Sequence, residues 1–295
     1  MNVSTGPVAM TEDYLRKFLF EDLPVKGSLV RLSKSWQEVM LRAQPGPEMQ
    51  DLLGETLCAS VLLTSNIKFR GSVSLQIQSA GRVRLLLGQC THTGSVRGVV
   101  RASDKPGSSL VEQGVLSINL EPDSEGAPYQ GIVNMPADGL VPALERYFLQ
   151  SEQIETRFWL VADSRECNGL MLQRLPGESE DPDGWNRLQH LAGSITNAEL
   201  KSWETGELLS KLFPEDNVRL FDPKQIQFGC SCSSHKVSGV LQSLGQEDIM
   251  NLIEERSIVE VRCEYCGQNY EFDRVDVAAL FARSPIAVLR NPGSH

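Results

Sequence analysis

Two segments of the chain alternate apolar and polar residues with a period of two. The first is "GSVSLQIQS" at 71–79, which places on one face Val73, Leu75 and Ile77. The second is "GVLSINLEP" at 114–122, which repeats the pattern with Leu116, Ile118 and Leu120. Because successive side chains of a strand point to opposite faces, both segments are predicted to be half-buried β-strands.

A different pattern lies between the N-terminus and these strands. The segment "EMQDLLGETLCASVLLTSN" at 48–66 is too long and too densely apolar for a strand, and it is rich in good helix formers. It is therefore predicted to be a largely buried helix. Since helices and strands are mixed rather than strictly alternating, the expected fold class is α+β, with a mixed N-terminal core domain over residues 1–176.

The segment "LPGESEDPDGWN" at 175–186 interrupts these patterns with glycines, prolines and acidic residues, which indicates a domain boundary. Beyond it, apolar residues recur at helical spacing, namely Trp185, Leu188, Leu191 and Ile195, then Leu200 with Trp203, then Leu208 with Leu212. We expect short amphipathic helices in a linker over residues 177–226. Helices below about 12 to 15 residues are marginal alone, so this linker must lay its apolar side on a neighbouring surface. It either stays packed there permanently or detaches under a signal, and the pattern leaves both interpretations open.

The strongest chemical signal is a pair of thiol motifs in the last part of the chain, at 227–295. Cys230 and Cys232 form a CxC, and Cys263 and Cys266 form a CxxC in the turn "CEYC", with Gly267 available for an unusual backbone angle. The 30 residues between the pairs are enough for two short helices and a strand that bring the pairs together. Four thiolates around one ion are the closed geometry of a structural Zn²⁺ site, without an open position for hydrolytic chemistry. His235 is then expected to be a surface residue rather than a ligand.

A domain this small has little core and needs a metal to hold it together. Structural zinc supplies about 10 to 16 kcal/mol of apparent binding energy, against a typical domain stability of about 5 to 15 kcal/mol. Loss of zinc is therefore expected to unfold the domain. Oxidised thiols no longer bind zinc, so oxidation and unfolding would be one event. A permanent structural site and a redox switch both remain open at this point.

Charge and composition exclude some classes of function and indicate the compartment in which the thiols act. The formal net charge of −10 disfavours nucleic-acid binding as the main activity, because such binding needs clustered Lys and Arg. The N-terminus lacks a basic region followed by an apolar core, and no run of 18 apolar residues occurs, so we expect a cytoplasmic protein without membrane insertion. In a reducing cytoplasm, paired cysteines are more often metal ligands or redox groups than structural disulfides. The remaining cysteines stand alone and are expected to be small buried hydrophobic residues: Cys58, Cys90 and Cys167.

Several longer segments resemble one known family, the bacterial redox-regulated 33 kDa heat-shock chaperones (chaperonins), which are zinc-dependent holdases. They are "YQGIV" at 129–133, "YFLQSEQIETRF" at 147–158, "MLQRLP" at 171–176, "LLSKLFPEDNVRLF" at 208–221, and the CxC and CxxC pairs with the following "YEFDRVDVAALF" at 270–281. The resemblance covers almost the entire chain. It is specific because the family combines a core, a helical linker and this cysteine spacing in that order.

The resemblance implies a mechanism for the four cysteines. In the family, the reduced protein binds Zn²⁺ through the residues that match Cys230, Cys232, Cys263 and Cys266, and it is inactive. Oxidative stress, especially with heat, pairs the first two and the last two cysteines in disulfides, expels zinc and destabilises the linker. The active form is a homodimer that holds unfolded or misfolded client proteins without ATP. The sequence "GxxxxGK[ST]" that would cradle ATP phosphates does not occur here, in agreement with that property.

If the linker leaves the core, its apolar residues and the core face that they uncover would become exposed and could hold clients. The candidate client-binding or switch residues are Trp185, Leu188, Leu191, Trp203, Leu208, Leu212 and Phe213. We accordingly predict a binding protein rather than an enzyme. Two alternatives stay open: a thiol-disulfide oxidoreductase that uses Cys263 and Cys266, and a zinc-ribbon module that binds nucleic acid. The neighbouring CxC and the absence of a thioredoxin-like βαβ pattern weigh against the first, and the acidic charge weighs against the second.

Overall fold

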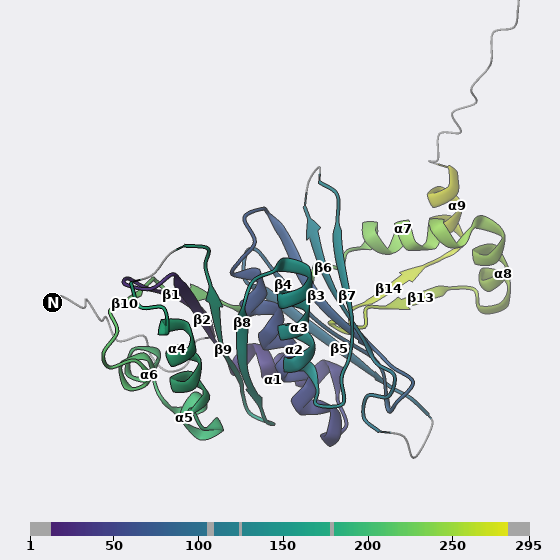
Figure 1. The fold of residues 1–295 in the computed structure, drawn as a ribbon. Helices are drawn as coiled ribbons and strands as arrows, with labels where there is room; N and C mark the ends of the chain where they lie inside the picture. The colour runs from purple at the N-terminus through teal and green to yellow at the C-terminus, as the bar shows by residue number, and fades with distance from the viewer. Residues whose placement is uncertain (1–12, 105–108, 124–125, 178–179, 283–295) are drawn as a thin grey trace, which may run out of the picture. The chain divides into compact units, whose positions relative to one another are not determined.

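The computed structural model describes residues 13–104, 109–123, 126–177 and 180–282. The first 12 residues of the predicted core domain, the last 13 residues of the predicted zinc-binding domain and residues 178–179 of the predicted boundary lie outside these ranges. The chain forms two compact units that divide after Cys230 (Figure 1). Both combine helices with antiparallel strands, which confirms the α+β class. The segment 177–226 belongs to the first unit.

Sheet A of the first unit has six strands that are distant in sequence. A hairpin of β1 and β2 is followed by β9 and then β8, while β10 and β11 both pair with β1. The pairs are antiparallel, and the longest register runs from Val25 opposite Arg174 to Leu32 opposite Cys167. The bounds are β1 Tyr14–Phe20, β2 Val25–Leu32, β8 Thr156–Ala162, β9 Cys167–Arg174, β10 Val218–Leu220 and β11 Lys224–Gln225.

Sheet B, also of six strands, contains both strands predicted from the alternating pattern. Its order is β12-β5-β4-β3-β6-β7, and the pairs are antiparallel apart from the parallel β12 and β5. Val73, Leu75 and Ile77 of β3 are fully buried, as the pattern predicts. The bounds are β3 Gly71–Gln78, β4 Val83–Thr91, β5 Ser95–Ala102, β6 Val115–Pro122, β7 Tyr129–Asn134 and β12 Gln227–Phe228.

The opposite face of β3 is less exposed than an alternating strand predicts. Ser72 is 9% and Ser74 is 4% exposed because side chains hydrogen-bond to them across the strands. Gln89 Nε2 donates to Ser72 Oγ at 3.1 Å, and Asn119 Nδ2 donates to Ser74 Oγ at 3.4 Å. Polar pairing therefore covers this face without an apolar layer.

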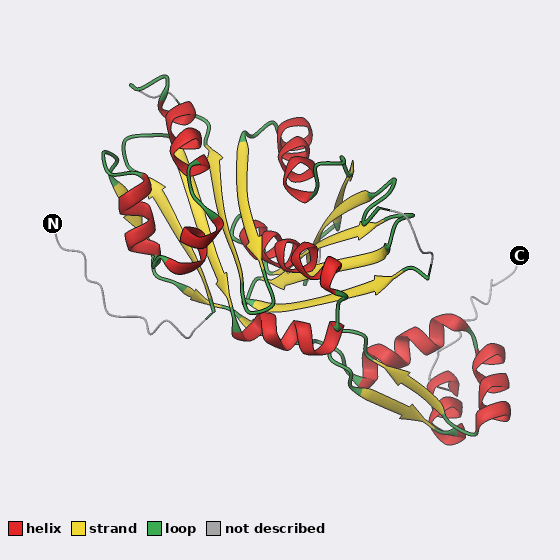
Figure 2. Cartoon of the chain, turned by 90° about the horizontal axis from the view of Figure 1, so that it is seen from below, coloured by secondary structure: helices red, strands yellow, loops and turns green. Residues whose placement is uncertain are grey.

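The predicted buried helix is α2, Pro47–Thr64, and it lies between the two sheets (Figure 2). It contacts strands of both sheets, and its residues Leu53, Leu57 and Leu62 are fully buried in the main core. Its buried hydroxyls are satisfied within the helix, since Thr56 and Thr64 each donate to the carbonyl four residues earlier at 2.7 Å. The other helices between and beside the sheets are α1 Lys34–Ala43, α3 Leu140–Tyr147 and the short π-helix η1 Phe148–Glu152.

The outer face of sheet A is covered by the three helices that the linker pattern predicts (Figure 1). They are α4 Gly184–Gly193, α5 Asn197–Ser202 and α6 Thr205–Leu212. They share a second apolar cluster with Phe18, Phe20 and Leu172 of the sheet. A capping box starts α5, because Glu199 N donates to Thr196 Oγ1 and Glu199 Oε2 accepts from Thr196 N. Sheet A is thus buried on both faces.

The described part of the second unit, residues 231–282, forms three short helices and one hairpin. Its core consists of seven buried apolar residues, Val237, Leu241, Ile249, Ile253, Val259, Phe272 and Val277. This confirms two short helices and a strand between the thiol pairs. The bounds are α7 Ser234–Leu244, α8 Gln246–Arg256, β13 Val259–Arg262, β14 Asn269–Phe272 and α9 Arg274–Ala282.

Candidate metal centre

The four predicted cysteines meet at one point. The Sγ atoms of Cys230, Cys232, Cys263 and Cys266 all lie within 4.8 Å of one another, and those of Cys232 and Cys266 are 3.3 Å apart. With Zn–S bonds of about 2.3 Å, tetrahedral geometry places the sulfurs about 3.8 Å apart. The cluster therefore matches the size and the donor set of a closed four-thiolate site. All four side chains are half-buried.

The CxxC pair is positioned by the hairpin of β13 and β14. The strands pair from Val259 opposite Phe272 to Arg262 opposite Asn269, and the cysteines occupy the turn between them. Gly267 N donates to Cys263 O at 2.8 Å, and Gly267 has a φ of +75°. The predicted unusual backbone angle at this glycine is confirmed, since a positive φ strains any residue with a Cβ.

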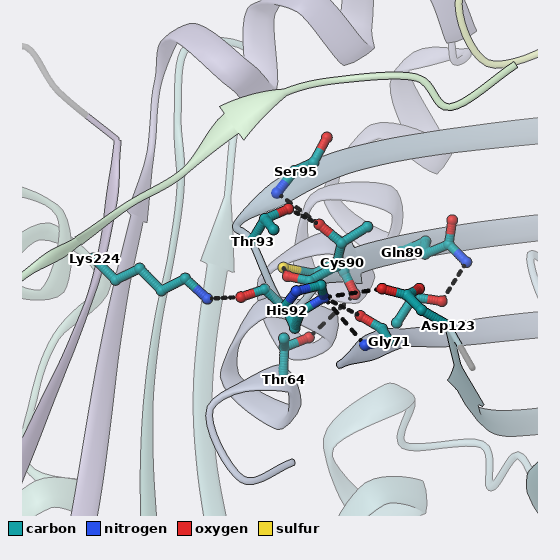
Figure 3. A network of polar contacts seen from close by, with 11 residues as sticks. Thr64, Gly71, Gln89, Cys90, His92, Thr93, Ser95, Asp123 and Lys224 are labelled. Atoms are coloured by element: carbon teal, nitrogen blue, oxygen red, sulfur yellow. Dashed lines mark hydrogen bonds and ion pairs between the residues drawn. The ribbon is translucent and has the colours of Figure 1, made fainter. Parts of the chain in front are cut away.

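The CxC pair follows a segment that runs from one sheet of the first unit to the other. Lys224 in β11 pairs with sheet A, and its Nζ donates to the carbonyl of His92 at the end of β4 in sheet B (Figure 3). Phe228 in β12 then pairs with Val96 of β5. His92 itself is held by Gly71 N, which donates to its Nδ1 at 3.1 Å. The chain therefore reaches Cys230 from a well-anchored position in the first unit.

Two hydrogen bonds to the sulfurs were missed from the sequence. Arg97 Nη1 lies 3.7 Å from Cys230 Sγ, and the hydroxyl of Tyr270 donates to Cys232 Sγ at 3.1 Å. The bond to Cys232 is the main cause that raises the pKa of Tyr270 to about 12, so this hydroxyl keeps its proton. Donors beside a sulfur favour its thiolate form, which is the form that binds metal. The sequence did offer a signal for Tyr270. Its segment "NYEF" alternates polar and aromatic residues just after the CxxC, which indicates a strand that starts beside the cysteines.

The remaining candidates behave as expected for residues outside the cluster. His235 is exposed in the first turn of α7 and does not join the four sulfurs, so its prediction as a surface residue is confirmed. Cys58, Cys90 and Cys167 are buried, as predicted. Burial raises the pKa of the Cys90 thiol to about 11 and also raises the pKa of Cys167. The thiols of Cys90 and Cys167 are therefore poor nucleophiles in the folded chain.

The seven candidate client-binding residues share one place in the fold. All of them belong to the apolar cluster between α4–α6 and sheet A, where Leu191 and Trp203 are partly buried and the other five are buried: Trp185, Leu188, Leu208, Leu212 and Phe213. The structure thus brings them together on one surface. In this conformation that surface is covered, and their role in binding clients stays a prediction.

Polar contacts also fasten these helices to the sheet. Arg31 of β2 donates from Nη1 to Lys201 O at 2.6 Å and from Nη2 to Trp203 O, so it binds the last carbonyls of α5. Lys201 Nζ reaches Asp163 Oδ2 at 2.7 Å. The hydroxyls of Tyr14 and Thr205 are 2.9 Å apart at the start of α6. Sequence reasoning missed these contacts because their partners lie far apart along the chain.

Comparisons with known proteins agree with the fold and the cysteine cluster. The model of the Hsp33 protein family matches residues 13–273. The 33 kDa chaperonin of Nitrosococcus oceani is 40% identical over 286 residues, which cover 95% of this chain and 99% of that protein. That of Azotobacter vinelandii is 41% identical over 283 residues, covering 92% and 95%.

A solved structure shows the same fold. The crystal structure of the 33 kDa chaperonin from Thermotoga maritima superposes with a TM-score of 0.76 at 21% identity, covering 91% of this chain and 98% of that one. Among the described residues, no helix has the length and apolar character needed to cross a membrane. The family match over most of the chain, together with the four-cysteine cluster, shows that this chain belongs to the Hsp33 family of chaperones.

Proposed function

We propose that the chain is a redox-regulated, ATP-independent holdase that keeps unfolding proteins from aggregating during oxidative and heat stress. The observation that carries the proposal is a four-thiol cluster, three of whose cysteines belong to a small unit with a core of seven buried apolar residues among its described residues. Such a unit depends on its metal for stability. In the reduced state the four thiolates would hold Zn²⁺, which supplies structural cross-linking rather than catalysis.

Oxidation is the proposed trigger. Two equivalents of hydrogen peroxide take four electrons from the four thiolates, form the disulfides Cys230–Cys232 and Cys263–Cys266, and are reduced to water. Each disulfide uses the sulfur electrons that would otherwise bind the metal, so Zn²⁺ is released. Without the metal, the second unit loses its main source of stability.

The consequence proposed for the first unit is the release of α4–α6. Residues 1–176 would then act as the stable core, 177–226 as a linker that becomes mobile, and 227–295 as the redox-switch domain. Detachment would expose the seven candidate residues and the face of sheet A that they cover. An exposed apolar surface of this kind binds unfolded proteins. We further propose that the active form is a homodimer and that the protein works in the cytoplasm.

One experiment tests the trigger and the activity together. Zinc content and suppression of aggregation of a heat-unfolding client are measured before and after treatment with hydrogen peroxide at elevated temperature. We expect zinc release and holdase activity to rise together. Zinc release without holdase activity would overturn the proposed switch.

Cysteine variants test the ligand set. Cys263→Ser replaces one thiolate by a weaker donor, so the purified reduced protein is expected to retain much less zinc per chain. His235→Ala is the matched control, because His235 is the nearest alternative ligand type and is exposed. Normal zinc content in the serine variant, or zinc loss in the histidine variant, would contradict four-thiolate binding.

A further inference from the structure

Strand β7 is the terminal strand of sheet B at the edge opposite β12. The opposite end is covered by β12, whereas β7 pairs with β6 alone. The terminal strand of any sheet carries backbone groups that point away from its single neighbour. The register of β7 identifies which groups these are.

Three residues of β7 direct their backbone N–H and C=O groups to the open side. Met135 N donates to Gly114 O at 2.8 Å, and the register continues through Val133 opposite Leu116 and Gly131 opposite Ile118. Hydrogen-bonded and non-hydrogen-bonded pairs alternate along antiparallel strands, so Gly131 and Val133 bond to β6. The residues between and beside them point outward: Gln130, Ile132 and Asn134. No described residue bonds to their outward backbone groups.

The side chains at this edge are uncharged, and apolar Ile132 and aromatic Tyr129 are exposed between and beside the polar Gln130 and Asn134. Ile132 is 62% and Tyr129 is 43% exposed, and the strand "YQGIVN" contains neither a charged residue nor a proline. The hydroxyl of Tyr129 donates to Glu152 Oε1 of η1 at 3.4 Å. An open, uncharged edge strand with exposed apolar side chains is the kind that another extended chain joins.

The terminal strand of sheet A is protected by comparison. In β8, the amide of Phe158 donates to Glu145 Oε1 at 3.2 Å, so a side chain covers that edge donor. Arg157 of the same strand pairs with Glu145 and adds a charge to the edge. Charges and covered donors are the usual means by which proteins prevent edge pairing. Strand β7 itself has no charged residue, and the carboxylate of Glu152 lies beside its first residue, Tyr129, rather than beside Ile132 at its centre.

We propose that β7 is a docking site for an extended segment of an unfolded polypeptide, which adds to sheet B as a seventh strand. This proposal rests on the proposed function, because it takes its ligand class from the holdase. Backbone hydrogen bonds would supply affinity without sequence specificity, and Ile132 with Tyr129 would favour apolar side chains. A folded protein has few free strands to offer, so the edge selects chains that have lost their structure. This site is separate from the surface under α4–α6.

Hydrogen exchange at single amides tests the proposal. The oxidised full-length protein is compared alone and with reduced, carbamidomethylated α-lactalbumin, a permanently unfolded chain, using mass spectrometry with electron-transfer fragmentation. The amides of Gln130, Ile132 and Asn134 are expected to exchange at least about tenfold more slowly in the complex, as for amides that gain a hydrogen bond. Those of Gly131 and Val133, which already bond to β6, serve as internal references.

Variants of Ile132 test the docking site independently of hydrogen exchange. Ile132→Pro removes one outward donor without removing a bond to β6, and Ile132→Lys adds a charge to the edge. Both are expected to weaken binding of the unfolded probe by about fivefold or more, the effect of about one lost hydrogen bond. Leu41→Lys is the matched control, because Leu41 is 68% exposed on α1, away from the edge. If the proline variant does not fold, the lysine variant and the exchange data decide.

The outcomes separate this proposal from the holdase itself. If the oxidised parent binds the probe but the three outward amides exchange at unchanged rates, the edge site is wrong and the holdase stands. If Ile132→Lys abolishes dimer formation while each subunit still binds the probe, β7 joins two copies of the chain, which also overturns the proposal. If the oxidised parent binds no unfolded chain, both proposals fail.

Discussion

Arg31 is the side chain that ties the linker helices most directly to sheet A. Its two terminal nitrogens bind the carbonyls of Lys201 and Trp203, which end α5 and would otherwise lack partners. Hydrogen bonds from a charged donor contribute about 1.5 to 3 kcal/mol each, more than the neutral bonds around them. We therefore expect Arg31 to contribute strongly to holding α5 closed.

Arg31→Ala is expected to lower the free energy of local opening of α5 by about 2 kcal/mol or more, since two charge-assisted bonds are lost. Amide exchange in residues 197–202 of the reduced, zinc-bound protein should rise about 30-fold, and holdase activity should appear without oxidant. Arg146→Ala is the control, because Arg146 is exposed on α3. Unchanged exchange in α5 would show that apolar packing alone holds the helix.

Glu55 is a second residue with a distinct physical signature. Burial, together with the carboxylate of Asp51 one turn earlier in α2, raises the pKa of Glu55 from 4.5 to about 7. Below pH 4.5 the carboxyl is mostly protonated in both the folded and the unfolded chain, so its ionisation does not change the free energy of unfolding. As pH rises to 7, only the unfolded chain gains the full benefit of ionisation, so the folded state loses stability.

Glu55→Gln is therefore expected to raise the free energy of unfolding at pH 8 by up to about 3 kcal/mol, at ~1.4 kcal/mol per pKa unit. At pH 4 the variant and the parent should unfold alike. Urea titrations at several pH values between 4 and 8 measure the difference. A difference that does not change with pH would contradict the raised pKa.

At the scale of elements, helix α4 shows how apolar packing holds the linker. Leu188 is fully buried against sheet A, and its neighbours Trp185 and Ala192 on the same side are also buried. A 10-residue helix is marginal alone, so α4 depends on this contact. Any change that weakens the contact should favour detachment.

Leu188→Ala is expected to cost about 2 to 5 kcal/mol of packing energy, and most of this should appear as easier detachment of α4. Limited proteolysis of the reduced protein should then cut within residues 184–213 faster than in the parent. Leu244→Ala is the control, because Leu244 is exposed at the end of α7. Equal cleavage rates would mean that α4 opens only when the whole first unit unfolds.

The elements themselves could largely be predicted from the sequence. The apolar pattern identified α2, α4–α6, β3 and β6. Helix α2 is buried nearly all round and is densely apolar, whereas each of the others places its apolar residues mainly on one side and shows a periodic pattern. The pairing of strands was not predictable, since β2 lies beside β9 although more than a hundred residues separate them. The buried serines of β3 were also missed, because cross-strand hydrogen bonds leave no mark in the pattern of a single strand.

At the scale of the whole molecule, the two units differ in what stabilises them. Among the described residues, the first has two extensive apolar clusters, whereas the second has one cluster of seven residues and three of the four thiols. The four thiols could be predicted from spacing alone, since CxC and CxxC restrict which atoms can meet. The donor Arg97 could not, because its place beside Cys230 depends on how sheet B folds, whereas Tyr270 lies within a few residues of the CxxC and could have been considered.

Removal of zinc by a chelator is expected to unfold residues 231–282 and leave the sheets of the first unit folded. Hydrogen exchange measured by mass spectrometry should show full exchange of α7–α9 within seconds, while β3 and β9 stay protected. Restoring Zn²⁺ under reducing conditions should restore protection. Retained protection of α7–α9 after the metal is removed would show that the seven-residue core suffices.

Helix α2 has a consequence for a protein that must work while other proteins unfold. It is packed by strands from both sheets, so neither sheet can separate without exposing fully buried leucines of the helix to water. The two sheets and α2 should therefore melt together in one cooperative step. If oxidation activates the protein as proposed, a part of the molecule must stay folded while the linker helices detach. Because both sheets share α2, that part is expected to be the two sheets with this helix.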